Sequence, residues 1–215
     1  MNRRPVGNPD RIFADSIKLK DLRNMSFDEV VDAYEKRVRN WYFGVSRKVL
    51  DDMASNFMLT TWCAVIIDFL SQYVSGERFG SKKSFLDFFK NHLEKKYNKK
   101  IKPIDSVKPN GNDHPCPERI ASIPEEFYHG FRCGLVHSGR ILEYGGVNRE
   151  NRKNAFVVKK WKSGRKKGFE IQLNPVILFK DLEKFFKQYL SDLKKPGVLQ
   201  NNFKKKFYWE YAIKL

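Results

Sequence analysis

The chain has 215 residues, of which 41% are hydrophobic, and this is enough for one domain with a buried core. It carries 42 Lys and Arg against 25 Asp and Glu, and the formal net charge of +17 favours a polyanionic partner, because cations that bind phosphates release counterions. The alternative is that this charge only keeps the protein soluble. The three cysteines, Cys63, Cys116 and Cys133, are odd in number and scattered, which argues against a disulfide framework and a C-x-x-C zinc site.

The sequence contains no recognisable targeting or membrane-spanning segment. Residues 1–5 lead into no hydrophobic stretch of signal-peptide length, and the longest apolar run is shorter than the roughly 18 residues that cross a bilayer. No basic amphipathic helix stands out that would bind an acidic membrane surface. We therefore expect a cytoplasmic protein without a membrane partner.

The first half of the chain predicts an arm followed by three helices. Residues 1–25 are polar and irregular, and we expect a loosely held N-terminal arm. Ser26 begins a capping-box sequence, and apolar residues then recur at helical spacing, which predicts a helix over about 27–50. The next helix, over about 52–75, is apolar around much of its circumference and should be central. A third helix is expected over about 82–97.

The second half of the chain predicts a loop, a short helix, a hairpin and a long helix. Prolines within 98–117 indicate a loop, and a serine with an early proline begins a helix over about 123–138. Residues 155–173 contain two β-type runs around a basic turn, which predict a two-stranded hairpin. A helix over about 175–194 follows, and residues 196–215 form a basic, aromatic tail.

The predicted fold is therefore mainly α. We expect a helical domain over residues 26–195, with the basic β-hairpin inserted before the last long helix.

The short predicted helix contains two residues suited to acting on phosphate esters. The sequence FRCGLVHSGR places Arg132 five residues before His137. Histidine, with a pKa of about 6.5, can move a proton near neutral pH, and arginine presents a planar fork of donors to phosphate oxygens. The alternative is a structural role, with Arg132 paired to Glu125 or Glu126 and with His137 favoured by the dipole at a helix C-terminus.

The segment Arg132-Cys133-Gly134-Leu135-Val136-His137 resembles the signature of the HEPN superfamily, an Arg followed after four to six residues by a His. The resemblance has motif-level specificity over residues 126–140 and extends over 26–195 in architecture. It implies a HEPN-like helical bundle and a homodimer in which two signature helices line a shared cleft. It also implies that Arg132 and His137 catalyse metal-independent RNA cleavage, in which the ribose 2′-hydroxyl attacks and leaves a 2′,3′-cyclic phosphate and a 5′-hydroxyl.

The spacing within the motif agrees with a cleft shared by two chains. Five residues at about 100° each place Arg132 and His137 about 140° apart around one helix, so a single helix does not direct both at one phosphate. His129, Cys133 and Arg140 are candidates for lining the cleft, although a surface histidine and a solvated end charge are the plain alternatives. The position after the family's Arg is usually polar, so Cys133 favours a version of the fold that does not cleave.

A second candidate surface is the basic stretch over residues 148–168, which holds nine Lys or Arg against a single Glu. Cations can hold phosphates while an aromatic ring stacks on unpaired bases, so we predict that the hairpin binds nucleic acid. The alternative is a solvated charged face. The predicted contacts are Arg149, Arg152, Lys153, Lys159, Lys160, Trp161, Lys162, Arg165, Lys166 and Lys167.

The predicted function is a metal-independent endoribonuclease without a cofactor, acting as a toxin or an antiphage defence factor. Its expected partners are RNA, a second copy of the chain, and an antitoxin or sensor protein. The alternative is a non-catalytic dimeric module of the same fold that binds RNA or protein. A DNA-binding regulator ranks last, because no helix-turn-helix spacing is recognisable. The histidines and cysteines are too scattered for a zinc site, and no P-loop sequence occurs.

Overall fold

The computed structural model describes residues 8–93, 97, 122–141, 145–163 and 166–215. In chain order the elements are β1 (Ile12–Ala14), β2 (Ile17–Lys18), η1 (Asp21–Asn24), α1 (Phe27–Val38), η2 (Arg39–Phe43), α2 (Gly44–Arg47), η3 (Met53–Ser55), α3 (Asn56–Ser75), α4 (Lys82–His92), α5 (Ile123–Glu126), η5 (Phe127–Cys133), α6 (Gly134–Ser138), β3 (Gly145–Val147), β4 (Phe156–Ser163), β5 (Lys166–Leu173), α7 (Pro175–Leu193) and α8 (Val198–Tyr211). The turns η1 and η3 are 3-10 helices, and η2 and η5 are π-helical. The predicted loop over 98–117 lies outside the described residues.

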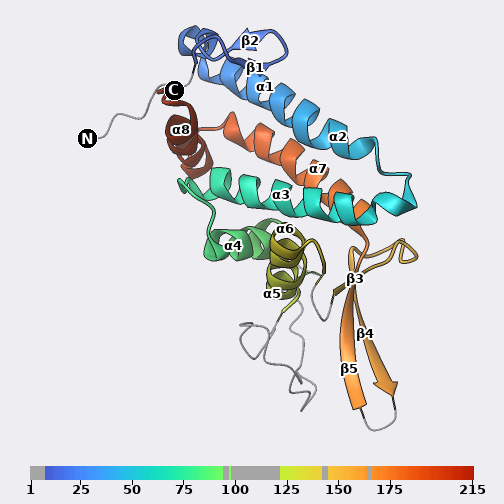
Figure 1. Ribbon diagram of the computed structural model, residues 1–215. Helices are drawn as coiled ribbons and strands as arrows, with labels where there is room; N and C mark the ends of the chain where they lie inside the picture. The colour runs from blue at the N-terminus through green and yellow to red at the C-terminus, as the bar shows by residue number, and fades with distance from the viewer. Residues whose placement is uncertain (1–7, 94–96, 98–121, 142–144, 164–165) are drawn as a thin grey trace.

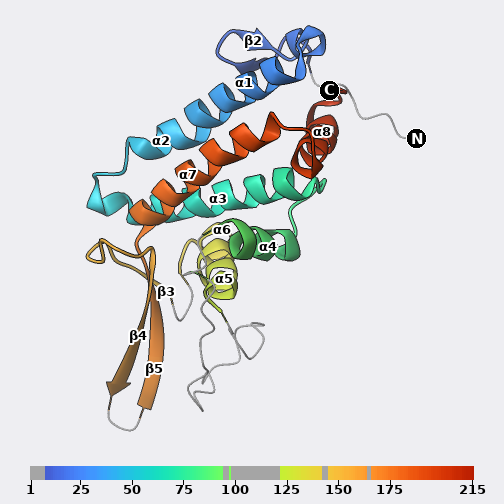
Figure 2. The ribbon, with the colours of Figure 1, turned by 180° about the vertical axis from the view of Figure 1, so that it is seen from behind.

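The structure is mainly helical, as predicted, and α3 lies at its centre. Helix α3 packs against α4, α7, α8 and η5. Figure 1 shows α1–α2, α7 and α3 side by side, with α4, α5 and α6 on the opposite side of α3 from α7. Helix α8 lies at one end of this arrangement, and the strands β4 and β5 project from the other end, as the view from behind in Figure 2 also shows.

The N-terminal segment packs on the helical body instead of forming a loose arm. Strands β1 and β2 pair antiparallel, and the side chain of Phe13 is buried, with its ring edge-on to Tyr211 at 5.2 Å between centroids. The Arg37 guanidinium also donates to the Phe13 carbonyl at 2.7 Å. The prediction for residues 1–25 is therefore wrong for β1, β2 and η1, because one anchoring aromatic ring outweighs the polar composition around it.

The first long helical segment begins at the predicted capping box. The Ser26 hydroxyl accepts from the Glu29 backbone N–H at 3.4 Å, and the Glu29 carboxylate accepts from the Ser26 N–H at 2.6 Å. The segment continues through α1, η2 and α2 and ends at Arg47, slightly before the predicted residue 50.

The prediction of a central helix over about 52–75 is confirmed by η3 and α3. This segment is long and apolar enough, by length and composition alone, to cross a membrane, a test that the core helix of a globular protein also passes. It ends at Gly76, whose φ of 69° is a conformation that glycine adopts without steric cost.

Helix α4 is shorter than the predicted 82–97. It ends at His92, because the backbone of Leu93 is extended, with ψ at 153°, and the Leu93 side chain turns into the core. The predicted helix over 123–138 is confirmed as α5, η5 and α6. Its cap is the Ser122 hydroxyl, which accepts from the Glu125 backbone N–H at 3.4 Å.

The predicted hairpin is confirmed as β4 and β5, which pair in register from Phe156↔Leu173 to Ser163↔Lys166. A third strand that the sequence did not indicate, β3, pairs parallel with the end of β5. Phe156, Ile171 and Leu173 are buried, so the hairpin is anchored at the end that joins the helical body.

Two helices follow the sheet, where one last long helix and a tail were predicted. Helix α7 matches the predicted 175–194, but residues 196–215 contain the further helix α8. The aromatic side chains of Phe203 and Phe207 are fully buried, four residues apart on one face of α8. The tail thus contributes to the core through Phe203 and Phe207, which share a helix face.

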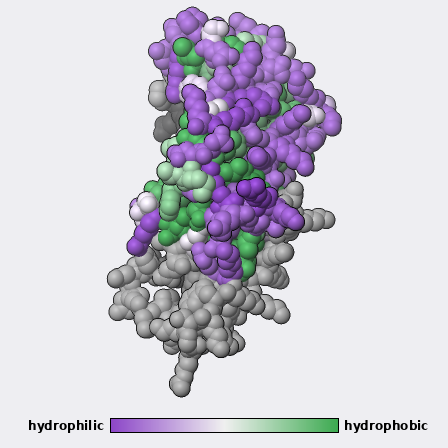
Figure 3. Space-filling model, turned by 90° about the vertical axis from the view of Figure 1, so that its right-hand side faces the viewer, coloured by the Kyte–Doolittle hydropathy of each residue, from purple (hydrophilic) through white to green (hydrophobic). Residues whose placement is uncertain are grey.

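One face of the molecule exposes apolar side chains. Figure 3 shows hydrophobic side chains gathered in the middle of the face on which α2 ends and α3 begins, among hydrophilic ones. Exposed large apolar residues in this part of the chain are Val45, Met53, Phe57 and Met58.

We predict that Asn174→Ala lowers the free energy of unfolding by about 2 kcal/mol. The buried Asn174 amide oxygen caps α7 by accepting from the N–H groups of Val176 and Ile177, at 3.0 and 3.3 Å. Its amide nitrogen donates to the carbonyls of Arg149 and Asn151. Urea unfolding measures the loss.

The matched control for this prediction is Asn201→Ala, at an exposed position within α8. This variant should lose no stability, since alanine is the better helix former. An Asn174→Ala midpoint equal to that of Asn201→Ala would contradict the assigned cap.

Candidate functional site

A π-helical turn shapes the helix that carries the candidate site. In η5 the Gly134 N–H donates back to the His129 carbonyl, five residues earlier. Gly130 lies against the folded side chain of Glu126, because a Cβ at this position would stand 2.2 Å from the Glu126 Oε1. Glycine therefore allows the buried Glu126 carboxylate to lie over the turn. Turns of this kind are frequent at functional sites.

Arg132 is held in place between a carboxylate and an aromatic ring. Its Nη2 donates to Asp68 Oδ2 at 3.4 Å, and its guanidinium carbon lies 5.5 Å from the centre of the Tyr128 ring. The two paired side chains remain 23% and 27% exposed, so the guanidinium is fixed but still reachable. Burial lowers the pKa of Arg132, but the Asp68 charge and the adjacent Cys133 raise it by more, so the net shift is upward.

His137 lies near the end of α6 and is exposed. The helix stops at Gly139, whose φ is 63° and whose N–H donates to the Leu135 carbonyl at 3.2 Å. Among the described residues no contact joins Arg132 to His137 within the chain. This agrees with the separation of about 140° expected from their spacing.

His129 also belongs to the same helix and is half-buried. A π-turn takes one residue more per turn than an α-helix, so His129 and His137, eight residues apart, stand close to two full turns apart on one face. Burial lowers the pKa of His129, and the positive charge of Lys82 lowers it further, while Glu125 opposes both. His129 is therefore biased toward its neutral form.

The other two candidate cleft residues differ in exposure. Cys133 is half-buried and has a free thiol, next to the Arg132 guanidinium in sequence. Arg140 is exposed beyond the end of α6, and its backbone N–H donates to the Gly134 carbonyl at 3.3 Å.

Asp68 is the residue of this site that sequence reasoning missed. If Arg132 had only a structural role, its expected partner was Glu125 or Glu126. The ion pair is instead made with Asp68 on α3. A signal was present in the sequence, because Asp68 is the one acidic residue between positions 56 and 75 of an otherwise largely apolar helix. A carboxylate in such a helix is costly to bury unless it has a partner.

The predicted nucleic-acid contacts of the hairpin region divide into three groups. Arg149 is committed to the protein itself: its guanidinium donates to Asn56 Oδ1, to the Leu50 carbonyl and to the Asp52 carbonyl at 2.9 Å. Arg152, Lys153 and Lys159 are exposed. The remaining predictions, Lys160, Trp161, Lys162, Arg165, Lys166 and Lys167, fall on side chains outside those that the structure describes.

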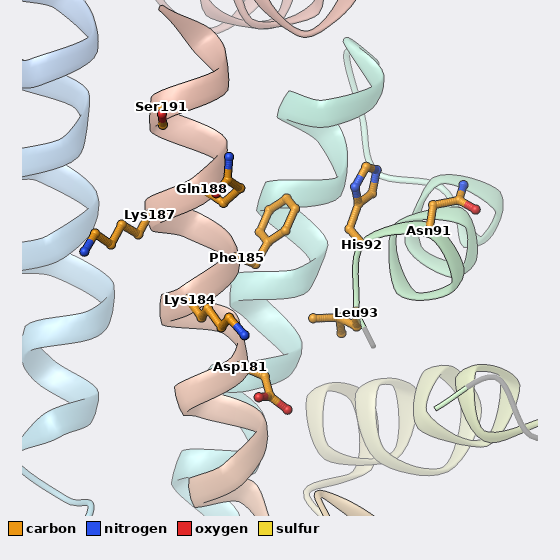
Figure 4. Close-up of a pocket in the computed structure, with 9 residues that line it drawn as sticks. All are labelled: Asn91, His92, Leu93, Asp181, Lys184, Phe185, Lys187, Gln188 and Ser191. Carbon is orange, nitrogen blue, oxygen red and sulfur yellow. The ribbon is translucent and has the colours of Figure 1, made fainter. Parts of the chain in front are cut away.

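A groove with a volume of about 730 Å³ lies away from this site, between the end of α4 and α7. Figure 4 shows His92 from α4 beside Phe185 from α7 in its lining, and their ring centroids are 5.4 Å apart. Burial lowers the pKa of His92. Within the described part of the chain no group of three or more His, Cys, Asp or Glu side chains could hold a metal ion. His114 and Cys116 lie outside that part.

Comparison of the chain with models of protein families, with curated proteins and with solved structures finds no match in any of the three.

We predict that Lys82→Ala raises the pKa of His129, because removing a nearby positive charge favours the protonated imidazolium. An NMR titration that follows the imidazole C–H resonances measures the midpoint. The matched control is Lys83→Ala, since Lys83 pairs with Asp87 at 2.9 Å and is not among the charges that shift His129. A His129 midpoint that stays unchanged in Lys82→Ala would show that the Lys82 charge does not act on His129.

Proposed function

We propose that the chain is a HEPN-like, metal-independent endoribonuclease that works as a homodimer. The observation that carries the proposal is the placement of Arg132 and His137 on one accessible helix. The guanidinium is fixed by Asp68 and Tyr128, and the imidazole is open to solvent. A fixed cation together with a free base is what cleavage by the ribose 2′-hydroxyl requires.

The chemistry divides between the two side chains. His137 takes the proton from the ribose 2′-hydroxyl, whose oxygen then attacks the adjacent phosphorus. Arg132 stabilises the negative charge that grows on the phosphate oxygens. The bond from phosphorus to the 5′-oxygen breaks and that oxygen takes up a proton, so the products are a 2′,3′-cyclic phosphate and a 5′-hydroxyl.

The proposed active site combines Arg132 of one chain with His137 of a second chain, because one helix directs these two side chains away from each other. Val136 supports this arrangement: it is an apolar residue 48% exposed, and it lies on the site helix one turn after Arg132. An exposed apolar side chain beside the candidate residues suits contact with the same helix of a second copy.

Asp68 has two consequences for such a site. Its carboxylate orients the Arg132 guanidinium before RNA arrives, and this lowers the entropic cost of binding a phosphate. It also offsets part of the arginine's charge, so a phosphate must share the guanidinium with it. In a toxin or an antiphage factor this competition keeps basal activity low until an antitoxin leaves or a sensor protein acts.

The test is cleavage of single-stranded RNA by the purified chain with metal ions chelated. Wild type should leave cyclic phosphate ends, and both Arg132→Ala and His137→Ala should cut at least about 100-fold more slowly. The control is His92→Gln, which replaces a histidine in the separate groove beside α7 and should cut as fast as wild type. If His137→Ala cuts RNA at the wild-type rate, the assigned site is wrong.

The second candidate function is a non-catalytic dimeric module that binds RNA or protein. Two observations favour it: Cys133 occupies the position where the HEPN pattern has a polar residue, and Asp68 already holds Arg132. RNA binding that weakens steeply with salt, with no products after long incubation, would select this function.

A further inference from the structure

The connection between α3 and α4 presents an aromatic side chain to solvent. Phe79 is 67% exposed, more than the other exposed aromatic side chains of the described residues, Trp41, Phe57 and Tyr208. The Arg78 guanidinium lies 4.9 Å from the centre of this ring and 5.0 Å from the centre of the Trp209 ring on α8. A cation thus lies against two aromatic rings that are far apart in the sequence.

This arrangement is built into the fold. The buried Lys206 ammonium donates to the Arg78 carbonyl at 3.0 Å and to Gln72 Oε1 at 2.7 Å, which ties the connection to α3 and α8. At the other end of the connection, the Ser81 hydroxyl donates to Glu77 Oε2 at 3.0 Å. The exposure of Phe79 therefore comes from a connection that is fixed by hydrogen bonds.

The same connection adjoins the candidate active site. A Cβ on Gly80 would lie 3.1 Å from Asp68 Oδ1, and Asp68 is the carboxylate that holds Arg132. Lys82, at the start of α4, is close enough to His129 to lower its pKa, although burial lowers that pKa more. Phe79 thus directly precedes Gly80, which lies against Asp68, and Asp68 binds the Arg132 guanidinium.

Cations outnumber acids on this surface: Arg78, Lys82, Lys83 and Lys205 stand against Glu77, Asp87 and Glu210. Asp87 pairs with Lys83 at 2.9 Å, while Glu77 and Glu210 accept from the hydroxyls of Ser81 and Tyr73 at 3.0 and 2.8 Å. Lys82 is exposed, and so is Lys205, which is four residues before Trp209 and therefore on the same face of α8. We name this surface the Phe79 platform and define it as Arg78, Phe79, Lys82, Lys205 and Trp209.

We propose that the Phe79 platform binds single-stranded RNA, with bases stacking on the Phe79 and Trp209 rings and phosphates held by the surrounding cations. Aromatic rings interleaved with Arg and Lys are the usual platform for unpaired bases. A protein contact would favour a continuous apolar patch, whereas here a guanidinium lies against both rings and lysines flank them. That the bound strand continues past Gly80 to Arg132 rests on the proposed function; the binding itself does not.

The platform lies at the opposite end of α3 from the basic hairpin. Figures 1 and 2 both place α8 and the α3–α4 connection at one end of the bundle, and β4 and β5 at the other. A strand bound at the platform therefore reaches the α6 helix without passing over the hairpin.

The experiment measures binding of a fluorescently labelled 2′-O-methyl RNA strand to the full chain by anisotropy. Such a strand has no free 2′-hydroxyl and so cannot be cut by the proposed chemistry. We expect Phe79→Ala to weaken binding at least about fivefold, and Phe79→Trp to retain it. The matched control is Phe57→Ala, which removes another exposed phenylalanine at the far end of α3 and should bind as wild type.

Two outcomes would overturn the proposal that the Phe79 platform binds RNA. One is equal affinity of Phe79→Ala and wild type, including the case in which neither binds. The other is an equal loss in Phe57→Ala, which would show general adhesion to apolar surface. Sedimentation of the same variants tests the protein-contact alternative: if Phe79→Ala dissociates a dimer while each chain still binds RNA as before, the platform is a protein contact.

The two proposals fail separately. If wild type binds the strand and Phe79→Ala does not, but wild type cuts no RNA, the proposed function is wrong and the platform stands. If wild type cuts RNA, and Phe79→Ala binds and cuts as well as wild type, the platform is wrong and the active site stands.

Discussion

The ion pair between Asp68 and Arg132 connects the core of this protein to its candidate chemistry. Asp68 belongs to α3, the helix against which α4, α7 and α8 pack, and Arg132 belongs to the turn η5. Because other helices pack on several sides of α3, the Asp68 carboxylate has little freedom to move. The ion pair with this carboxylate therefore fixes the position of the Arg132 guanidinium. Packing of a largely apolar helix thus determines where the Arg132 guanidinium lies.

The π-turn η5 is the second constraint on the site. It adds a residue to the helix between Phe127 and Cys133, and it brings His129 toward the face that carries His137. Gly130 permits this because the Glu126 side chain occupies the space where a Cβ would be. On the other flank, the α3–α4 connection brings Gly80 against Asp68. Each of these two glycines therefore leaves room for a carboxylate: Gly130 for that of Glu126, and Gly80 for that of Asp68.

Local signals in the sequence predicted most of the helices and the hairpin, because those signals act within a few residues. The capping box at Ser26, the cap at Asn174 and the glycine stop at Gly76 each act through hydrogen bonds or dihedral angles of neighbouring residues. The burial of Phe13 and the helix α8 were missed, because their stabilising contacts come from the other end of the chain. The partner of Arg132 was missed for the same reason: Asp68 is 64 residues away in sequence.

The central claim is that Arg132 of one chain and His137 of another act on the same ribose–phosphate link. Mixing purified Arg132→Ala with His137→Ala, each of which is expected to cut RNA very slowly alone, tests it directly. Native mass spectrometry first shows that the chains have exchanged into mixed dimers. Those dimers should recover RNA cleavage, because one of their two shared sites still combines Arg132 of one chain with His137 of the other. Mixed dimers that form but cut no faster than either variant alone would contradict the shared site.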